Sequence, residues 1–333
     1  IISYEIDVFR GNVKVQRNFL NLATYVALFP QLIAGPIVRY ETIEDELSNR
    51  KHSFENFAYG ARRFVIGLAK KVLIANMLGE FCNKFSATDE KSVVLYWLFA
   101  ISYMLQIYFD FSAYSDMAIG LGRIFGFHFL ENFNYPYISK SITEFWRRWH
   151  MTLGAWFKDY VFYSISLSKA FMKLSKKTRE KFNAFFATLI PTSIAMLAVW
   201  FGTGIWHGAS WKYVMYGIYY CLIMILGLLT EPLFKKLYEK MHVNREGKIY
   251  KALQVVRTFI FVNIGMLMFR ADDLKIFGQM LVSMFHNFTF SVLTSGDLFE
   301  VKLDVYDFLL LAFGALVLPV SYTHLRAHET TLH

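Results

Sequence analysis

Two histidines lie beside tryptophans in a chain that is otherwise strongly apolar. The first, His207, lies in the segment GTGIWHGASW, between Gly204 and Gly208 and next to Trp206. Glycine lets a backbone leave helical geometry and approach a ligand closely, and a neutral imidazole accepts a proton near neutral pH. One interpretation is a broken helix that lines a cavity and presents His207 to it. The alternative is a simple extracellular turn that carries an interfacial histidine.

The second histidine, His150, lies in the segment SITEFWRRWHMTLGAWFKDY at residues 141–160. If this segment is one helix, one of its faces carries His150 together with Trp146, Arg147, Leu153 and Gly154. Glu144 would then reach Arg147 or Arg148 one turn along the chain. Such a helix could bring His150 into an active site. Snorkelling arginines and a hydrogen-bonded histidine are also typical of an interfacial amphipathic helix, so the stretch alone leaves both interpretations open.

A third polar feature is found in YMLQIYFDFSAYSDMAIGLGRIFGF, where Gln106, Asp110 and Asp116 interrupt an apolar run of membrane length. An ionisable group at that depth is costly and normally faces a bundle interior or a watery cavity. Six residues correspond to about 600° of helix rotation, so the two aspartates lie roughly 120° apart. Asp110 is therefore a candidate for lining a passage, and hydrogen bonding between helices is the structural alternative.

The elements that must position these residues are transmembrane helices. Of the 333 residues 55% are hydrophobic and only 18% are charged, whereas a soluble domain carries about 25% charged residues. Crossing about 30 Å of hydrocarbon takes roughly 20 apolar residues, and lipid admits only helices or closed barrels. We predict an all-α, polytopic membrane protein whose helices lie near 17–38, 57–81, 92–125, 182–206, 211–230, 253–269 and 305–320.

The net charge of +9 indicates topology rather than nucleic-acid binding, because the lysines and arginines lie in short segments between the apolar runs. Two such segments, 168–181 and 235–251, are separated by two predicted spans and therefore lie on the same side. The positive-inside rule makes that side cytoplasmic, so the segment around His207 points outward or folds back into the membrane. Two cysteines cannot form a disulfide framework.

The ends of the chain suggest a fragment. Residue 1 is not methionine and no signal-peptide pattern follows it, so we expect an N-terminally truncated chain. One domain is predicted over 1–320, and the change of composition after the last apolar run indicates a non-native or disordered tail at 321–333. Its histidines, His324, His328 and His333, could suggest a metal site, but no other ligand cluster is near them in the sequence, and we expect no metal.

Four separated segments together resemble one family. FPQLIAGPIVRY at 29–40, YFDFSAYSDMAIGLGRIFGF at 108–127, ENFNYPYISKSITEFWRRWHMTLGAWFKDYVF at 131–162 and GIWHGASWKYVMYG at 204–217 are similar to membrane-bound O-acyltransferases. The resemblance extends over residues 1 to about 318 in the right order. It points especially to bacterial members that acylate alginate or lipoteichoic acid.

This resemblance implies a helical ring around a thin centre, in which a cytoplasmic donor funnel meets an outer acceptor funnel. It implies that His207 is catalytic and that His150 belongs to the active site. We expect substrate-binding or passage-lining roles for five further residues: Asp110, Trp146, Trp149, Trp206 and Trp211. The arginines of the 141–160 segment would stay at the cytoplasmic interface.

The expected reaction moves an acyl group, most simply acetyl, from a cytoplasmic thioester to a hydroxyl of an extracytoplasmic glycan. The donor would be acetyl-CoA or an acyl carrier protein acting as co-substrate, with no tightly bound cofactor, in the bacterial cytoplasmic membrane. The sequence contains no G-x-S-x-G elbow to support an acyl-serine route. A transporter or flippase of an acylated substrate is one alternative, although we find no inverted repeat. The other is a scaffold that relays the acyl group to a periplasmic acetylase.

Overall fold

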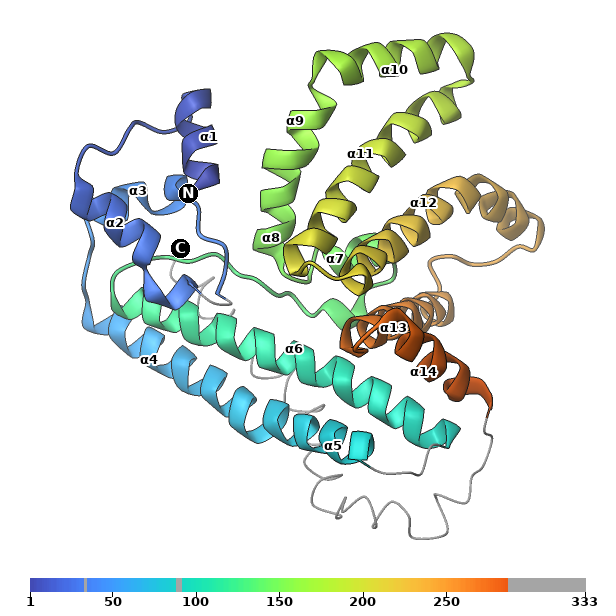
Figure 1. Cartoon of the computed structure of the whole chain (residues 1–333), viewed down its shortest axis with the longest axis horizontal. Coiled ribbons are helices and arrows are strands. Elements are labelled where there is room, and N and C mark those ends of the chain that lie inside the picture. The colour runs from blue at the N-terminus through green and yellow to red at the C-terminus, as the bar shows by residue number, and fades with distance from the viewer. Residues whose placement is uncertain (33–34, 88–91, 287–333) are drawn as a thin grey trace.

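The computed structural model describes residues 1–32, 35–87 and 92–286, and every regular element among them is helical (Figure 1). The elements in order are α1 (Ile2–Arg10), α2 (Phe19–Ala27), η1 (Phe29–Gln31), α3 (Tyr40–Ser48), α4 (Phe54–Ala69), η2 (Lys70–Ala75), α5 (Asn76–Ala87), α6 (Val93–Ile124), η3 (Pro136–Ile138), α7 (Ile142–Trp146), α8 (Met151–Trp156), η4 (Phe157–Phe162), α9 (Tyr163–Ser166), α10 (Lys169–Lys181), α11 (Ala184–His207), α12 (Trp211–Lys240), α13 (Lys248–Arg270) and α14 (Leu274–His286). The predicted all-α class is confirmed.

Four helices in the described ranges are long and apolar enough to cross a membrane: α6, α11, α12 and α13. They confirm the spans predicted near 92–125, 182–206, 211–230 and 253–269. Leucines such as Leu222 and Leu226 are exposed on α12, as expected of side chains that face lipid. The polytopic architecture is therefore as predicted, and the closed ring stays a prediction for the whole protein.

The span predicted at 17–38 is wrong. Helix α2 has only nine residues, which rise about 13.5 Å, less than half of the hydrocarbon thickness. The chain becomes extended at Leu28, and Pro30 then lies in the short 3-10 turn η1. A proline without an N–H, whose ring restricts the preceding residue, prevents α2 from continuing. The helix predicted at 305–320 and the tail 321–333, with its three histidines, lie outside the described residues.

The segment predicted at 57–81 is an irregular helix. α4 and α5 are joined through η2, a π-helical stretch, into one run that packs side by side with α6 (Figure 1). The close approach needs glycine: a Cβ on Gly60 would lie 2.4 Å from the carbonyl oxygen of Gly120, and one on Gly67 would lie 2.7 Å from that of Ala113. Small residues allow such backbone contact between membrane helices.

The π-helical stretch directs basic side chains onto α6. Lys70 Nζ lies 2.7 Å from Asp116 Oδ2, and Arg63 Nη2 forms a second ion pair with Asp116 Oδ1 at 2.9 Å. All three side chains are almost completely buried. Lys71 Nζ lies 2.6 Å from Asp110 in a half-exposed pair. Asp116 thus has the structural role that the sequence analysis gave as the alternative, which is bonding between helices, because two cations of the neighbouring helical run neutralise its charge.

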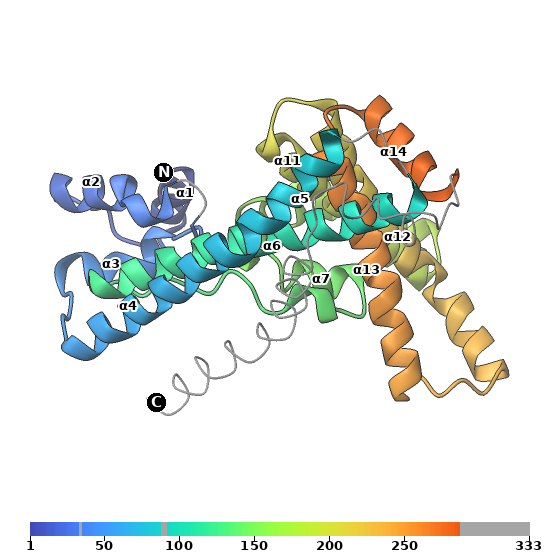
Figure 2. The same cartoon turned by 90° about the horizontal axis from the view of Figure 1, so that it is seen from below.

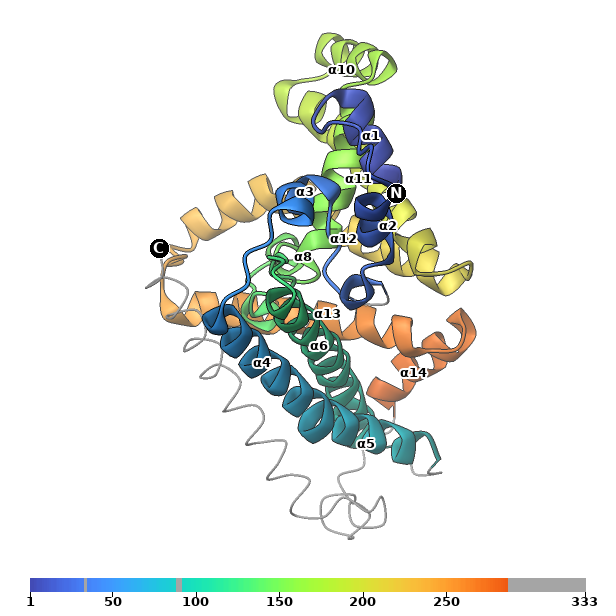
Figure 3. The ribbon, with the colours of Figure 1, turned by 90° about the vertical axis from the view of Figure 1, so that its left-hand side faces the viewer.

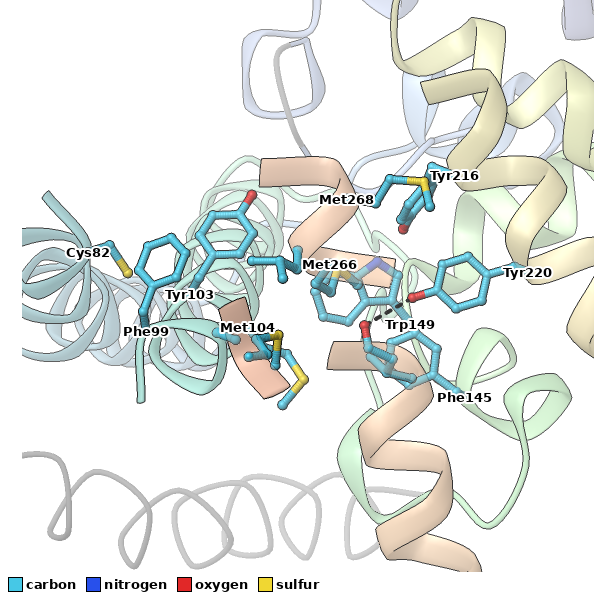
Figure 4. Packing of buried hydrophobic residues seen from close by; sticks show 14 of the residues in the cluster. Cys82, Phe99, Tyr103, Met104, Phe145, Trp149, Tyr216, Tyr220, Met266 and Met268 are labelled. Carbon is cyan, nitrogen blue, oxygen red and sulfur yellow. Dashed lines mark hydrogen bonds between the residues drawn. The ribbon is translucent and has the colours of Figure 1, made fainter. Parts of the chain in front are cut away.

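Helices α12 and α13 form a hairpin (Figure 2). Tyr219 Oη donates to the carbonyl of Phe261 at 2.8 Å, and Tyr220 Oη donates to that of Val262 at 3.2 Å. A Cβ on Gly265 would lie 2.2 Å from the Tyr220 hydroxyl, so the missing side chain makes the space for it. Tyr220 belongs to the largest buried cluster, built from α5, α6, α7, α11, α12, α13 and α14 (Figure 4).

The N-terminal helices α1, α2 and α3 lie together as one layer (Figure 3), and they share a buried cluster with the end of α6. Tyr4, Tyr25 and Tyr40 pack against one another, with ring centroids 4.8 Å to 6.5 Å apart. Arg39 Nη2 lies 2.7 Å from Asp159 of η4, and the Tyr160 hydroxyl donates to Asp7. These contacts fasten the layer to the segment that follows His150.

Candidate active site

His207 is the last residue of α11, because the chain leaves helical geometry at the next position. Gly208 has φ +149° and ψ 162°, values that L side chains rarely adopt. A Cβ there would also lie 2.9 Å from the Tyr213 ring. α12 begins after the short connection, at Trp211. The predicted end of the helix at His207 is confirmed, and glycine is needed at residue 208 for both conformation and space. The cavity-lining role of this break stays a prediction.

Two further glycines bring α11 and α12 together beside this break, and the helices diverge from it (Figure 1). A Cβ on Gly204 would lie 2.6 Å from the carbonyl oxygen of Tyr213, and one on Gly217 would lie 2.2 Å from that of Trp200. The backbones therefore touch directly at the end of α11. The position of His207 is fixed by this crossing.

Aromatic rings surround the imidazole of His207. Its centroid lies 4.8 Å from Trp206, 5.2 Å from Phe269, 5.9 Å from Tyr216 and 6.3 Å from Tyr213. Among the described residues, His207 makes these ring contacts and no hydrogen bond through either ring nitrogen. Its nitrogens are thus not committed to a partner from α12 or α13.

The prediction that His150 lies within one long helix is wrong. α7 ends at Trp146, and His150 adopts the left-handed conformation, with φ 45° and ψ 52°, before α8 begins. The reason is a backbone pairing that the local pattern does not reveal. Met151 N–H donates to the carbonyl of Asn132, and Asn134 N–H donates to that of Arg148, each at 2.9 Å. This pairing replaces the helical turn.

Of the two ion pairs expected for Glu144, the one with Arg148 is found, and it links α7 to the turn that follows it. Glu144 Oε1 lies 2.9 Å from Arg148 Nη2, and Arg148 Nη1 also donates to the carbonyl of Asn134 at 3.1 Å. Arg148 therefore helps to close the turn before His150. The Arg148 side chain is 28% exposed.

His150 is buried and is held by an amide that the sequence analysis did not single out. Its Nδ1 lies 2.9 Å from Asn132 Oδ1, and its ring meets the edge of Phe111 at 4.7 Å between centroids. His150 lies outside the four candidate spans. Burial of the imidazole, as the larger cause, and the charge interaction with His207, as the smaller cause, lower the pKa of His150 to about 3. The imidazole is therefore neutral at physiological pH. In the sequence Asn132 is simply an asparagine among aromatic residues, and this pattern gives no sign of its contact with His150.

Trp206 joins the two histidines. Its ring centroid lies 5.9 Å from that of His150 and 4.8 Å from that of His207, and its side chain is half exposed. Two segments more than fifty residues apart thus meet at one tryptophan. The tertiary structure brings together both histidines predicted to belong to one site.

The other predicted residues are distributed over different surroundings. Trp149 belongs to the buried cluster, where it stacks on Phe145 with centroids 5.6 Å apart (Figure 4), and the partly buried Trp146 packs against that cluster. Trp211 is 74% exposed at the start of α12, and Asp110 pairs with Lys71. The passage-lining role of these four residues stays a prediction. Across the described ranges, histidine, cysteine, aspartate and glutamate do not gather into a group that could hold a metal ion.

Comparison with known proteins yields one family. The model of the membrane-bound O-acyltransferase family matches residues 13–271. The probable alginate O-acetylase of Pseudomonas aeruginosa is 37% identical over 319 residues, which is 95% of this chain and 56% of that protein. The peptidoglycan O-acetyltransferase of Helicobacter pylori is 34% identical and covers 78% of this chain, with 45% of its own length matched.

A third relative is less similar in sequence. The teichoic acid D-alanyltransferase of Bacillus subtilis is 31% identical over 263 residues, which is 78% of this chain and 63% of that protein. The chain thus spans roughly half to two thirds of the length of the curated relatives it matches. Both histidines, together with Asn132 and Trp206, lie inside the matched range.

Proposed function

The chain belongs to the membrane-bound O-acyltransferase family, and from that premise we propose that the whole protein transfers an acyl group, most simply acetyl, from a cytoplasmic thioester to a hydroxyl of an extracytoplasmic glycan. The observation that carries this proposal is the contact of Trp206 with both His150 and His207 at the break between α11 and α12. The names of the relatives, an alginate O-acetylase, a peptidoglycan O-acetyltransferase and a teichoic acid D-alanyltransferase, support acyl transfer to a polymer.

In the proposed reaction His207 is the general base. Its imidazole accepts the proton of the glycan hydroxyl while the hydroxyl oxygen attacks the acyl carbon. The new C–O bond forms, the C–S bond breaks, and the thiolate leaves and takes up the proton from the imidazolium. The uncommitted nitrogens of His207, inside an aromatic surrounding, suit a group that gains and loses a proton within one turnover.

The basic segments support a cytoplasmic donor. Residues 168–181 and 235–251 carry an excess of lysine and arginine, and α10 presents most of its lysines to solvent. Acetyl-CoA and acyl carrier proteins are both anionic, so either would be attracted to a basic face. The acceptor would then reach His207 from the opposite face, in the cytoplasmic membrane of a bacterium.

The test uses the whole protein reconstituted in lipid vesicles. Acetyl-CoA with an isotope-labelled acetyl group is supplied on the side of the basic segments, and an oligosaccharide on the other side. Mass spectrometry then determines whether a labelled ester forms on the oligosaccharide. The matched control replaces the thioester by its thioether analogue, which cannot release a thiolate.

Each outcome distinguishes one mechanism. Labelled ester on the oligosaccharide supports direct transfer across the membrane. Ester that appears only after a separate acetylase is added supports the relay, and intact labelled thioester inside the vesicles supports transport. Either of these two results would overturn direct transfer by this protein.

A further inference from the structure

Asn132 is completely buried, and each of its side-chain polar atoms has a partner. Its Nδ2 donates to Ser115 Oγ of α6 at 3.1 Å. Its Oδ1 receives the Thr152 hydroxyl at 2.9 Å and the Thr152 backbone N–H at 3.4 Å, in addition to its contact with His150 Nδ1. The amide therefore ties α6 to the beginning of α8 at the position of His150.

These partners fix which end of the amide is which. A backbone N–H can only donate, so the atom that faces Thr152 N–H must be the carbonyl oxygen. The Thr152 hydroxyl agrees with this orientation, because its oxygen already accepts the Ile37 N–H at 2.9 Å and its proton is free to point to Asn132. The orientation of Asn132 thus follows from the Thr152 N–H, and the arrangement of the Thr152 hydroxyl is compatible with it.

The orientation of the amide also determines the proton on His150. A carbonyl oxygen has no hydrogen to give, so the 2.9 Å contact requires that Nδ1 of His150 carries the proton. In the neutral imidazole the other nitrogen, Nε2, then has its lone pair available. Free imidazole side chains in water prefer the opposite tautomer, with the proton on Nε2, so the buried amide selects the less common form.

From this geometry we propose that Asn132 is a positioning residue that holds His150 in the Nδ1-protonated tautomer, so that Nε2 accepts a hydrogen bond from a reacting group. The role in the reaction depends on the proposed acyl transfer, and the tautomer itself does not. His150 then complements His207: one histidine takes the proton of the attacking hydroxyl, and the other orients a donor group beside it. The contact of both rings with Trp206 places them in one site.

The backbone supports this assignment. His150 has a left-handed conformation, which is unfavourable for a non-glycine residue. The Met151 N–H to Asn132 carbonyl bond maintains that conformation and aligns the side chain of His150 with that of Asn132. Asn132 therefore controls His150 through its main chain as well as through its amide.

The first experiment measures the tautomer directly. In the whole protein, labelled with 15N and 13C in histidine, NMR identifies which ring nitrogen is bonded to hydrogen, and the His150→Gln variant assigns the signal by difference among the histidines. We expect the proton on Nδ1. A proton on Nε2 in the unmodified protein would overturn the proposal without any need for an Asn132 variant.

The second experiment compares three variants. Asn132→Leu keeps the volume and removes the acceptor, so the Nε2-protonated form should appear. We expect kcat to fall at least about 10-fold, by analogy with partners that orient metal-bound histidines. Asn132→Asp retains an acceptor and should keep the proton on Nδ1 and recover transfer. Ser115→Ala, the matched control, removes only the partner of Nδ2 and should leave the tautomer unchanged.

The melting temperature of each variant shows whether a loss of transfer comes from a destabilised fold or from a changed tautomer of His150. If Asn132→Leu loses transfer at an unchanged tautomer, Asn132 has only a structural role and the proposal is wrong. If the tautomer is as expected and the whole protein forms no ester, the positioning of His150 by Asn132 is upheld and the proposed function fails. If ester forms while His150 carries its proton on Nε2, the function is upheld and the positioning fails.

Discussion

Gly217 of α12 lies directly against the carbonyl of Trp200 in α11, so closely that a Cβ at residue 217 would be 2.2 Å from that oxygen. The crossing that holds His207 in place thus depends on the absence of one methyl group. We expect Gly217→Ala to separate the two helices and lower the melting temperature of the detergent-solubilised protein, at a cost of about 1–3 kcal/mol for overpacking.

Gly227, ten residues further along the same helix, is the matched control. Nothing lies within 4 Å of a Cβ built there, and alanine favours a helix over glycine by up to about 1 kcal/mol. Gly227→Ala should therefore leave the melting temperature unchanged or raise it. Equal destabilisation by both substitutions would contradict the role assigned to the crossing.

Replacing His207 with alanine should abolish transfer and leave the fold intact, because the residue ends α11 and its contacts with other described residues are ring contacts. We expect a loss of at least about 100-fold in the whole protein, the lower end for a general base. The measurement is ester formed on the glycan, with detergent-solubilised yield as the folding control. His286→Ala, at the exposed end of α14, should have no effect. Near-normal transfer by a folded His207→Ala protein would remove His207 from the mechanism.

The two aspartates of α6 should differ in their effect on stability. Asp116→Asn removes a buried carboxylate shared by Arg63 and Lys70, and breaking such a buried pair costs about 3–5 kcal/mol. Asp110→Asn acts on a pair in which both side chains are about two fifths exposed, where about 0–1 kcal/mol is expected.

Thermal melting of both variants in the same detergent tests this difference. A smaller loss for Asp116→Asn than for Asp110→Asn would contradict the structure. Because Asp110→Asn should fold, its transfer rate also tests the predicted passage-lining role of Asp110, and unchanged transfer would argue against that role.

The two basic segments should be inaccessible from outside the cell. A membrane-impermeant thiol reagent should fail to label Ser175→Cys or Asn244→Cys in intact cells and should label both after the membrane is opened. Ala209→Cys, in the exposed connection beside His207, should be labelled from outside. Background is low because the native Cys82 and Cys221 are buried. Labelling of either basic segment in intact cells would reverse the proposed orientation.

The sequence by itself determined the all-α membrane class, four of the spans and the break at His207. These features follow from local composition: apolar runs of membrane length specify helices in lipid, and glycines on both sides of His207 permit the backbone to turn. The length of α2 was not determined in this way, because hydropathy does not register the helix stop before Pro30.

Only the tertiary structure decided how His150 is presented. Its neighbours within one helical turn predicted an unbroken helix, but the backbone of residues 132–134 pairs with that of residues 148–151 and forces His150 into the left-handed conformation. The same pairing brings in Asn132, and Trp206 arrives from more than fifty residues away. A hydrogen bond between distant segments produces no periodic pattern in the sequence of either segment. The contacts among these residues could therefore be identified only in the folded chain.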